Sequence, residues 1–188
     1  MRRTNALRLL WPATLALALG ACAGGNYRPV SDTPVRIGPA YTIHGTTYVP
    51  AAAPAYDAVG YASWYGSESG NRTANGEQFR PGWITAAHTT LPLPTYVEVT
   101  ALDSGRRIIV RVNDRGPFAR GRLIDLSRAA AEQLGMKAQG HAPVRVRRVE
   151  PSERDRERLR KGKAATSLPP LAGRELQRLR ERLATEAR

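Results

Sequence analysis

Residues 96–112 contain two strand patterns joined by a tight turn, and this arrangement strongly limits how the chain can fold. TYVEVTAL alternates apolar and polar residues from Tyr96, and RRIIVRV follows the Asp-Ser-Gly turn at 103–105. Alternation on both sides of a short Gly-containing turn is typical of a β-hairpin. We therefore expect a hairpin here and a mainly β fold around it.

Further segments between residues 60 and 149 continue the β pattern. YASWYG is aromatic and alternating, and APVRVRRV at 142–149 is a final alternating strand. One helix is predicted, because Ser127 can cap RAAAEQL and Gly135 can end it. Many short strands with one small helix favour a closed or nearly closed barrel.

The segments on either side of the barrel differ from it in composition. Residues 22–55 have prolines at 29, 34, 39, 50 and 54. Proline at this density prevents a long helix, so we expect a tether, within which AYTIHGTTYVP could pair as two short strands. Residues 150–188 form a charged, partly helical tail, with leucines at 176, 179 and 183 at helical spacing. The tail is either solvated or a helix that docks on a partner or a membrane surface.

The N-terminus has the layout of an export signal. Three arginines precede an apolar run from Leu9 to Leu19, which is short for a membrane span, and Leu19-Gly20-Ala21-Cys22 resembles a bacterial lipobox. We expect a signal peptide over residues 1–21 and lipidation of Cys22, the sole cysteine of the chain. Cys22 as one more small residue of the apolar run is the alternative.

The formal net charge is +13, which favours a polyanionic or acidic partner. Nucleic acid, an anionic membrane surface and a carboxylate-rich wall polymer all satisfy this criterion. Export leaves little access to nucleic acid, so the cell envelope is the expected partner and nucleic acid is not.

Four titratable residues of the barrel segment are candidates for chemistry: Glu77, His88, Asp114 and Asp125. Cleavage of a glycosidic bond needs an acid, usually with a second carboxylate nearby. Each residue also has a structural interpretation. Asp114 could build the turn at Arg115-Gly116-Pro117, Asp125 could satisfy amides before the helix, Glu77 could be an exposed turn residue, and His88 could be a core histidine.

Several other kinds of site are disfavoured. No His or Cys cluster has the spacing of a metal site, and we expect neither a metal nor a cofactor. GSESGNRTANG lacks the lysine of a phosphate-binding loop, and no Gly-x-Ser-x-Gly elbow is present.

The motifs GYASWYG, TANGEQF, TAAHTTLPLPTYVEV, VRVNDRGPF and RLIDLSRAAAEQLG resemble, in order, those of the rare lipoprotein A (RlpA) family. The resemblance covers roughly residues 56–149. It implies a six-stranded double-psi β-barrel with one or two short helices. It also implies a lipoprotein of the periplasm, anchored in the outer membrane, that cleaves peptidoglycan glycan as a lytic transglycosylase, with a preference for strands stripped of stem peptides.

The resemblance also assigns roles to single residues. Glu77, Asp114 and His88 fall on acidic and histidine positions of the family's site, and Asp125 on an acidic position before the helix. Asp114 is the favoured acid, with Glu77 opposite it. Trp64, Tyr65 and Trp83 are candidate sugar platforms or core residues, while Arg111, Arg115 and Arg120 could orient the glycan or tune the aspartates.

The C-terminal tail differs from the family pattern, and a non-catalytic function is an alternative. Many family members end in a SPOR domain that binds denuded glycan at the septum. Residues 150–188 form an Arg-rich tail instead, so recruitment through division or envelope proteins that bind the tail is the expectation. A non-catalytic, expansin-like module that binds peptidoglycan is the alternative to the enzyme.

Overall fold

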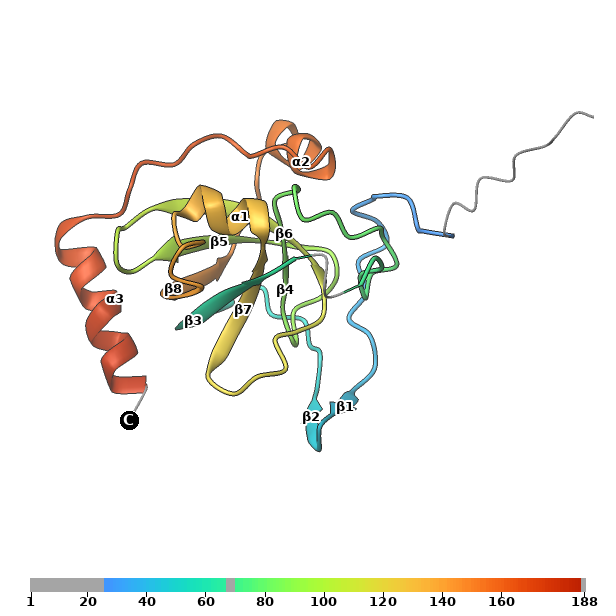
Figure 1. The fold of residues 1–188 in the computed structure, drawn as a ribbon, viewed down its shortest axis with the longest axis horizontal. Helices are drawn as coiled ribbons and strands as arrows, with labels where there is room; N and C mark the ends of the chain where they lie inside the picture. The colour runs from blue at the N-terminus through green and yellow to red at the C-terminus, as the bar shows by residue number, and fades with distance from the viewer. Residues whose placement is uncertain (1–25, 67–69, 187–188) are drawn as a thin grey trace, which may run out of the picture.

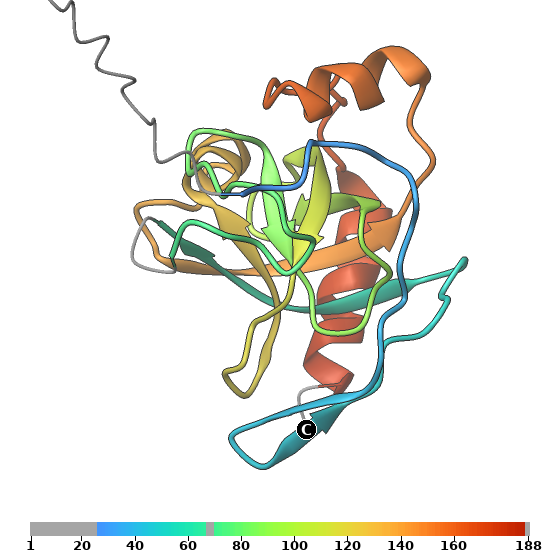
Figure 2. The same cartoon turned by 90° about the vertical axis from the view of Figure 1, so that its right-hand side faces the viewer.

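Six strands close into a barrel among the residues that this computed structural model describes, 26–66 and 70–186 (Figures 1 and 2). They are β3 (Asp57–Tyr65), β4 (Thr85–Ala87), β5 (Thr95–Ala101), β6 (Arg107–Asp114), β7 (Arg122–Ser127) and β8 (His141–Arg148). Their order around the barrel is β3-β7-β4-β6-β5-β8. The predicted six-stranded barrel is confirmed, whereas the predicted signal peptide and Cys22 lie outside the described residues.

The barrel consists of two halves with matching topology. β3 pairs in parallel with β7, β6 pairs in parallel with β4, and β4 and β7 meet antiparallel at the centre. β5 and β8 pair with each other and close the barrel. The succession β3-β4-β5 is thus repeated as β6-β7-β8, which is the pseudo-twofold arrangement expected of a double-psi barrel.

The hairpin and the helix that were predicted from local sequence patterns are both present in the structure. β5 and β6 form the expected antiparallel hairpin, with Tyr96 opposite Arg111. Val97, Val99, Val110 and Val112 on this hairpin are fully buried in the main core. Helix α1 (Arg128–Leu134) starts at Ser127, whose Oγ accepts a hydrogen bond from the Ala130 amide at 3.2 Å, and ends at Gly135 with a φ of 85°.

The N-terminal segment lies against the barrel along much of its length, although its composition predicted a tether. Strands β1 (Tyr41–Ile43) and β2 (Thr46–Tyr48) form the expected short antiparallel pair. Upstream, the Asp32 carboxylate accepts hydrogen bonds from the Tyr96 hydroxyl at 2.8 Å and from Arg111 Nε at 3.2 Å. These contacts attach the segment to β5 and β6.

The charged tail also packs on the barrel of its own chain. Helix α2 (Glu153–Arg160) buries Leu159 in the main core, and Arg160 forms an ion pair with Asp32 at 2.5 Å. Helix α3 (Gly173–Glu186) places Leu176 and Leu179 against Val59 and Leu102, at the side of the barrel seen in Figure 1. The leucine face predicted from spacing therefore has an intramolecular partner.

None of these described helices combines the length and the apolar character that a membrane span requires.

A single glycine controls how the tail attaches. Gly105 lies in the β5–β6 turn with a φ of 72°. Its carbonyl accepts a hydrogen bond from the Leu171 amide at 2.7 Å, and a Cβ on residue 105 would lie only 2.0 Å from the Leu171 oxygen. We expect Gly105→Ala to release residues 161–186 and to increase their amide hydrogen exchange. Gly140→Ala is the matched control, because its φ of 77° imposes similar strain but a Cβ there meets nothing within 4 Å. Equal exchange in both variants would contradict the attachment.

Candidate active site

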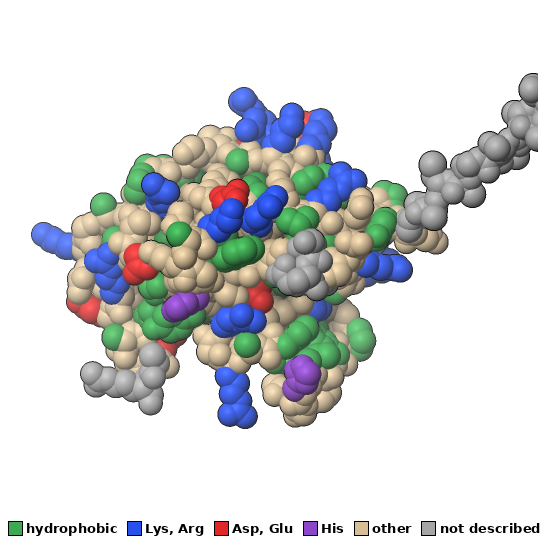
Figure 3. All heavy atoms as spheres, viewed as in Figure 1, with side chains coloured by type: hydrophobic (Ala, Val, Ile, Leu, Met, Phe, Trp, Pro, Cys, Tyr) green, Lys and Arg blue, Asp and Glu red, His purple; other side chains and the backbone are tan. Residues whose placement is uncertain are grey.

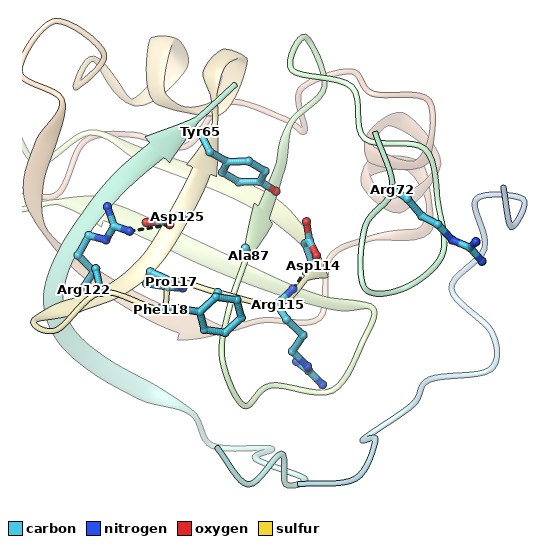
Figure 4. Close-up of a pocket in the computed structure, with 11 residues that line it drawn as sticks. Tyr65, Arg72, Ala87, Asp114, Arg115, Pro117, Phe118, Arg122 and Asp125 are labelled. Carbon is cyan, nitrogen blue, oxygen red and sulfur yellow. Dashed lines mark hydrogen bonds and ion pairs between the residues drawn. The ribbon is translucent and has the colours of Figure 1, made fainter. Parts of the chain in front are cut away.

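A cavity of about 460 Å³ opens at the ends of β3 and β6, beside β7 (Figure 4). Its lining combines two acids, aromatic rings and arginines: Tyr65, Arg72, Ala87, Asp114, Arg115, Gly116, Pro117, Phe118, Ala119, Arg122 and Asp125. The two aspartates that were predicted separately thus share one cavity.

Strand register explains why the aspartates meet. Ala87 on β4 pairs with Asp114 on one side and with Asp125 on the other. Neighbouring strands lie about 4.8 Å apart, so the two aspartate backbones are about 10 Å apart across β4. The small side chain of Ala87 leaves the space between them open.

Asp114 ends β6 with one oxygen engaged and the other available. Its Oδ1 accepts hydrogen bonds from the amides of Ala74 at 2.7 Å and Arg115 at 2.8 Å, whereas Oδ2 has no hydrogen-bond partner among the described residues. Burial raises the pKa of the Asp114 carboxyl above its usual value, although the two amides and the charge of Arg115 oppose the shift. A carboxyl with a raised pKa and a free oxygen facing a cavity can carry and donate a proton.

Asp125 on β7 is held at both oxygens. Ser63 donates a hydrogen bond to Oδ1 at 2.6 Å, and the Arg122 guanidinium lies 3.3 Å from Oδ2. Burial raises its pKa as well, while Ser63 and Arg122 favour the charged form. Neither Ser63 nor Arg122 was predicted as a site residue, because the pairing of Ser63 with Asp125 depends on the parallel register of the distant strands β3 and β7.

Tyr65 lies between the two acids at the end of β3. Its ring stacks on Phe79 with centroids 4.6 Å apart, and its hydroxyl is buried with no hydrogen-bond partner among the described residues. Figure 4 shows this hydroxyl pointing toward Asp114. Burial, together with the negative charges of Asp114 and Asp125, raises the pKa of Tyr65 well above its usual value, so the hydroxyl stays a donor. An unpartnered buried donor at a cavity is suited to a ligand oxygen.

Glu77 does not line this cavity, contrary to its predicted place opposite Asp114. It is 1% exposed, and Arg111 donates to both of its oxygens, at 2.6 and 2.8 Å. Asn75 and Asn113 also donate to its carboxylate, at 2.9 and 2.8 Å. Burial contradicts the exposed turn residue that was the structural alternative for Glu77. Its carboxylate is fully hydrogen-bonded and holds the loop 71–79, from which the Ala74 amide reaches Asp114.

His88 also lies outside the cavity, in the interior. Its Nδ1 accepts hydrogen bonds from the amides of Thr90 at 3.2 Å and Leu91 at 3.1 Å, so the proton of the neutral ring is on Nε2, 2.8 Å from the Tyr56 hydroxyl. Burial, aided by the charge of Arg115, lowers the pKa of His88 to about 4. This arrangement fits the alternative that His88 is a hydrogen-bonded core histidine.

The other predicted binding residues divide between the cavity and other places. Tyr65 and Arg115 line the cavity, but the Arg115 guanidinium donates to the carbonyls of His88, Leu91 and Ile37. Trp64 lines a different hollow and donates from Nε1 to the Lys137 carbonyl at 3.2 Å. Trp83 lies beneath the guanidinium of Arg80 and against Gly162. Phe118 is the aromatic residue at the cavity that was not predicted.

Within residues 26–66 and 70–186, no group of three or more His, Cys, Asp or Glu side chains is suited to hold a metal ion.

Comparison with known proteins identifies the barrel. Residues 57–146 match the double-psi β-barrel family described as lytic transglycolase. The matched range includes residues of all six strands of the barrel, which is therefore similar to this family. The chain is 56% identical over 113 residues to the endolytic peptidoglycan transglycosylase RlpA of Pseudomonas aeruginosa (strain UCBPP-PA14), which covers 59% of this chain and 33% of that protein. The RlpA of Rickettsia bellii (strain RML369-C) is 47% identical over 115 residues, 59% of this chain and 51% of that protein.

The chain therefore spans about a third to a half of the length of these relatives. Among solved structures, Streptomyces papain inhibitor (SPI) aligns with a TM-score of 0.43 and 24% identity, over 50% of this chain and 96% of that one. The predicted resemblance of the barrel to RlpA is confirmed by these matches.

The first prediction concerns Glu77. In Glu77→Gln, the buried Arg111 guanidinium keeps its charge but loses its fully buried counterion and retains only Asp32, at 3.2 Å. We therefore expect a loss of about 3 kcal/mol in the free energy of unfolding, measured with urea. Glu132→Gln is the control, because it breaks an exposed ion pair with Lys137 and should change stability by less than about 1 kcal/mol. Unchanged stability of Glu77→Gln would contradict the anchoring role.

The second prediction concerns His88. Its pKa of about 4 lies below the ordinary 6.5, so the unfolded chain binds this proton more readily. The stability contributed by the neutral ring is complete above pH 6.5 and is lost as the pH falls toward 4. Between pH 6.5 and about pH 5 we expect the wild type to lose about 2 kcal/mol more than His88→Asn, whose amide oxygen can replace Nδ1 as acceptor. Parallel denaturation curves across this range would count against a buried neutral His88.

Proposed function

We propose that this protein is a lytic transglycosylase that cleaves the bond between N-acetylmuramic acid and N-acetylglucosamine in peptidoglycan. The observation that carries the proposal is that Asp114 and Asp125 line one cavity, each beside Ala87, with an oxygen of Asp114 free. The match of residues 57–146 to the lytic transglycolase family and the names of the relatives support the same activity.

The environments of the two aspartates suggest a division of roles. Asp114 has the free oxygen and the raised pKa of a general acid, and donates its proton to the glycosidic oxygen as the bond to C1 breaks. Asp125, whose charged form Ser63 and Arg122 favour through their contacts, faces the positive charge that develops on the sugar. The resemblance had suggested Glu77 for this second role, but the buried pair with Arg111 leaves Asp125 as the second acid at the cavity.

The nucleophile in this reaction is the C6 hydroxyl of the same muramic acid residue. Its oxygen forms the new bond to C1, and its proton passes to the Asp125 carboxylate. The product has a 1,6-anhydro end, and no water is consumed. Tyr65 is positioned to donate its hydroxyl proton in a hydrogen bond to a substrate oxygen between the acids. Glycan without stem peptides is the proposed substrate, because a cavity of about 460 Å³ leaves little room for a branch.

We also propose a lipid anchor at Cys22 that holds the protein at the outer membrane, facing the periplasm. The support is the basic, apolar and small-residue order of residues 1–22. Division or envelope proteins remain proposed partners. The described tail offers them the exposed side of α3, because Leu176 and Leu179 already contact the barrel.

The third prediction tests the chemistry. Wild type should convert purified glycan to fragments with 1,6-anhydro ends, and these should contain no ¹⁸O when the reaction is run in H₂¹⁸O. Asp114→Asn should lower the rate by about 10²–10⁴-fold because the general acid is lost. Asp125→Asn should also lower it, whereas Asp103→Asn, at the exposed β5–β6 turn, should not. Products are measured by mass spectrometry.

Two outcomes would overturn the proposal in different ways. Incorporation of ¹⁸O at the new ends would indicate hydrolysis. Intact glycan with every sample, together with retained binding in a pull-down, would leave a wall-binding module without catalysis.

A further inference from the structure

A second hollow of about 420 Å³ adjoins the catalytic cavity and has no role in the mechanism above. The two hollows share Pro117, Phe118, Ala119 and Arg122 of the loop between β6 and β7, so they form one continuous groove. Another hollow of about 250 Å³ shares only Arg115 with the catalytic cavity, and the guanidinium of Arg115 is held there by backbone carbonyls. The open continuation of the cavity therefore runs toward Phe118.

The far wall of the second hollow is the β1–β2 hairpin, through Ile43, His44, Thr46 and Tyr48. Figures 1 and 2 show this hairpin beside the β6–β7 loop in both views. Residues 41–48 lie outside the range 57–146 that the family model matches, so the model does not include this wall. The hairpin turns through His44 and Gly45, both with positive φ, and the Tyr41 hydroxyl donates to the Thr89 carbonyl at 2.7 Å. A two-residue turn and this anchor hold the wall in place.

Aromatic rings join the two walls. Tyr48 lies 5.7 Å from Phe118 and 5.3 Å from Tyr41, measured between ring centroids. Phe118 is 38% exposed, so part of its ring is accessible to a ligand in the groove. Aromatic faces of this kind suit the apolar face of a pyranose ring, and a polymeric substrate must extend beyond the cavity in which it is cut.

The groove also carries unpaired positive charge. Arg120 is exposed and forms no hydrogen bond or ion pair with any residue in the described ranges. Figure 3, which views this face, shows Lys and Arg side chains around the hollow region. N-acetylmuramic acid carries a carboxylate on its lactyl group, or further carboxylates when a stem peptide extends it. Either is complementary to Arg120.

We infer that the groove between the β1–β2 hairpin and the β6–β7 loop binds the sugars next to the cleaved bond, with Tyr48 and Phe118 stacking on one ring and Arg120 pairing with a muramic acid carboxylate. The inference rests on the proposed function for the identity of the polymer. It assigns to the hairpin a binding role that the family barrel alone does not contain.

The test measures binding by calorimetry to the full chain carrying Asp114→Asn, so that affinity is read without cleavage. The ligands are a glycan tetrasaccharide without stem peptides, the same tetrasaccharide with them, and chitotetraose, which has no carboxylate. Phe118→Ala and Tyr48→Ala should each weaken all glycan binding about tenfold. Phe118→Trp should bind as tightly as the parent, because it retains an aromatic face. Tyr61→Ala is the matched control, since Tyr61 is 39% exposed but lies on β3 outside the groove.

Arg120→Gln tests the charge. It should weaken binding of the muramic acid ligands roughly threefold at low salt and leave chitotetraose unchanged. If Arg120→Gln binds the tetrasaccharide without stem peptides more weakly, the partner of Arg120 is the lactyl carboxylate. If only binding of the peptide-bearing tetrasaccharide is weakened, the partner is a carboxylate of the stem peptide. Arg154→Gln, at an exposed arginine of α2, is the control. If Arg120→Gln binds all three ligands as the control does, the carboxylate contact is wrong.

The outcomes separate this inference from the proposed function. If the wild type cleaves glycan but Phe118→Ala and Tyr48→Ala bind as tightly as Tyr61→Ala, the groove inference is overturned and the enzyme remains. If no glycan is cleaved but these two variants still weaken binding, the groove is supported and catalysis is not.

Discussion

The ion pair between Glu77 and Arg111 is the interaction on which the site depends. Both side chains are 1% exposed, and two charges at this depth are tolerated only when their hydrogen bonds are satisfied. The pair fixes the loop 71–79 to β6, and this loop supplies the Ala74 amide that fixes one oxygen of Asp114. On its other side Arg111 bonds Asp32, which also binds Arg160. One buried guanidinium thereby connects the N-terminal segment, the barrel, the catalytic loop and, through Asp32, helix α2.

The fold was predictable where the signals are local. The hairpin at 96–112 and the helix between Ser127 and Gly135 follow from alternation, turn chemistry and caps, all read within a few residues. The position of the tails was not predictable in this way. Proline density correctly excluded helix from residues 26–55, but the attachment of that segment depends on Asp32 finding Tyr96 and Arg111, 64 and 79 residues away. Leucine spacing predicted an amphipathic helix in the tail. The partner of its apolar face, the barrel surface at Val59 and Leu102, is visible only in the folded structure.

The site was predictable as a set of residue types but not as an arrangement. Asp114 and Asp125 meet because β4 runs between β6 and β7 and Ala87 is in register with both, and parallel pairing of distant strands leaves no local signal. Glu77 follows Asn75-Gly76, a pattern typical of exposed turns, yet its partner Arg111 is 34 residues away and draws it inside. The burial of Glu77 therefore depends on a contact that the local motif does not contain. Tyr65 and Phe118 line the cavity, whereas Trp64 lies at another hollow and Trp83 packs against Gly162, and these places depend on contacts between residues distant in the sequence.

The barrel and the β1–β2 hairpin have different consequences for a polymeric substrate. The barrel brings two acids to one cavity, where we propose that the bond is cleaved, but the two acids alone do not determine where along a glycan strand the cut occurs. A groove that continues past the cut determines which sugars are held, because binding energy from remote units positions the reacting one. The hairpin is fixed at Tyr41 to the loop after β4, the strand that also carries Ala87. The groove proposed for recognition and the aspartates proposed for chemistry are thus both attached to β4 and the loop that follows it.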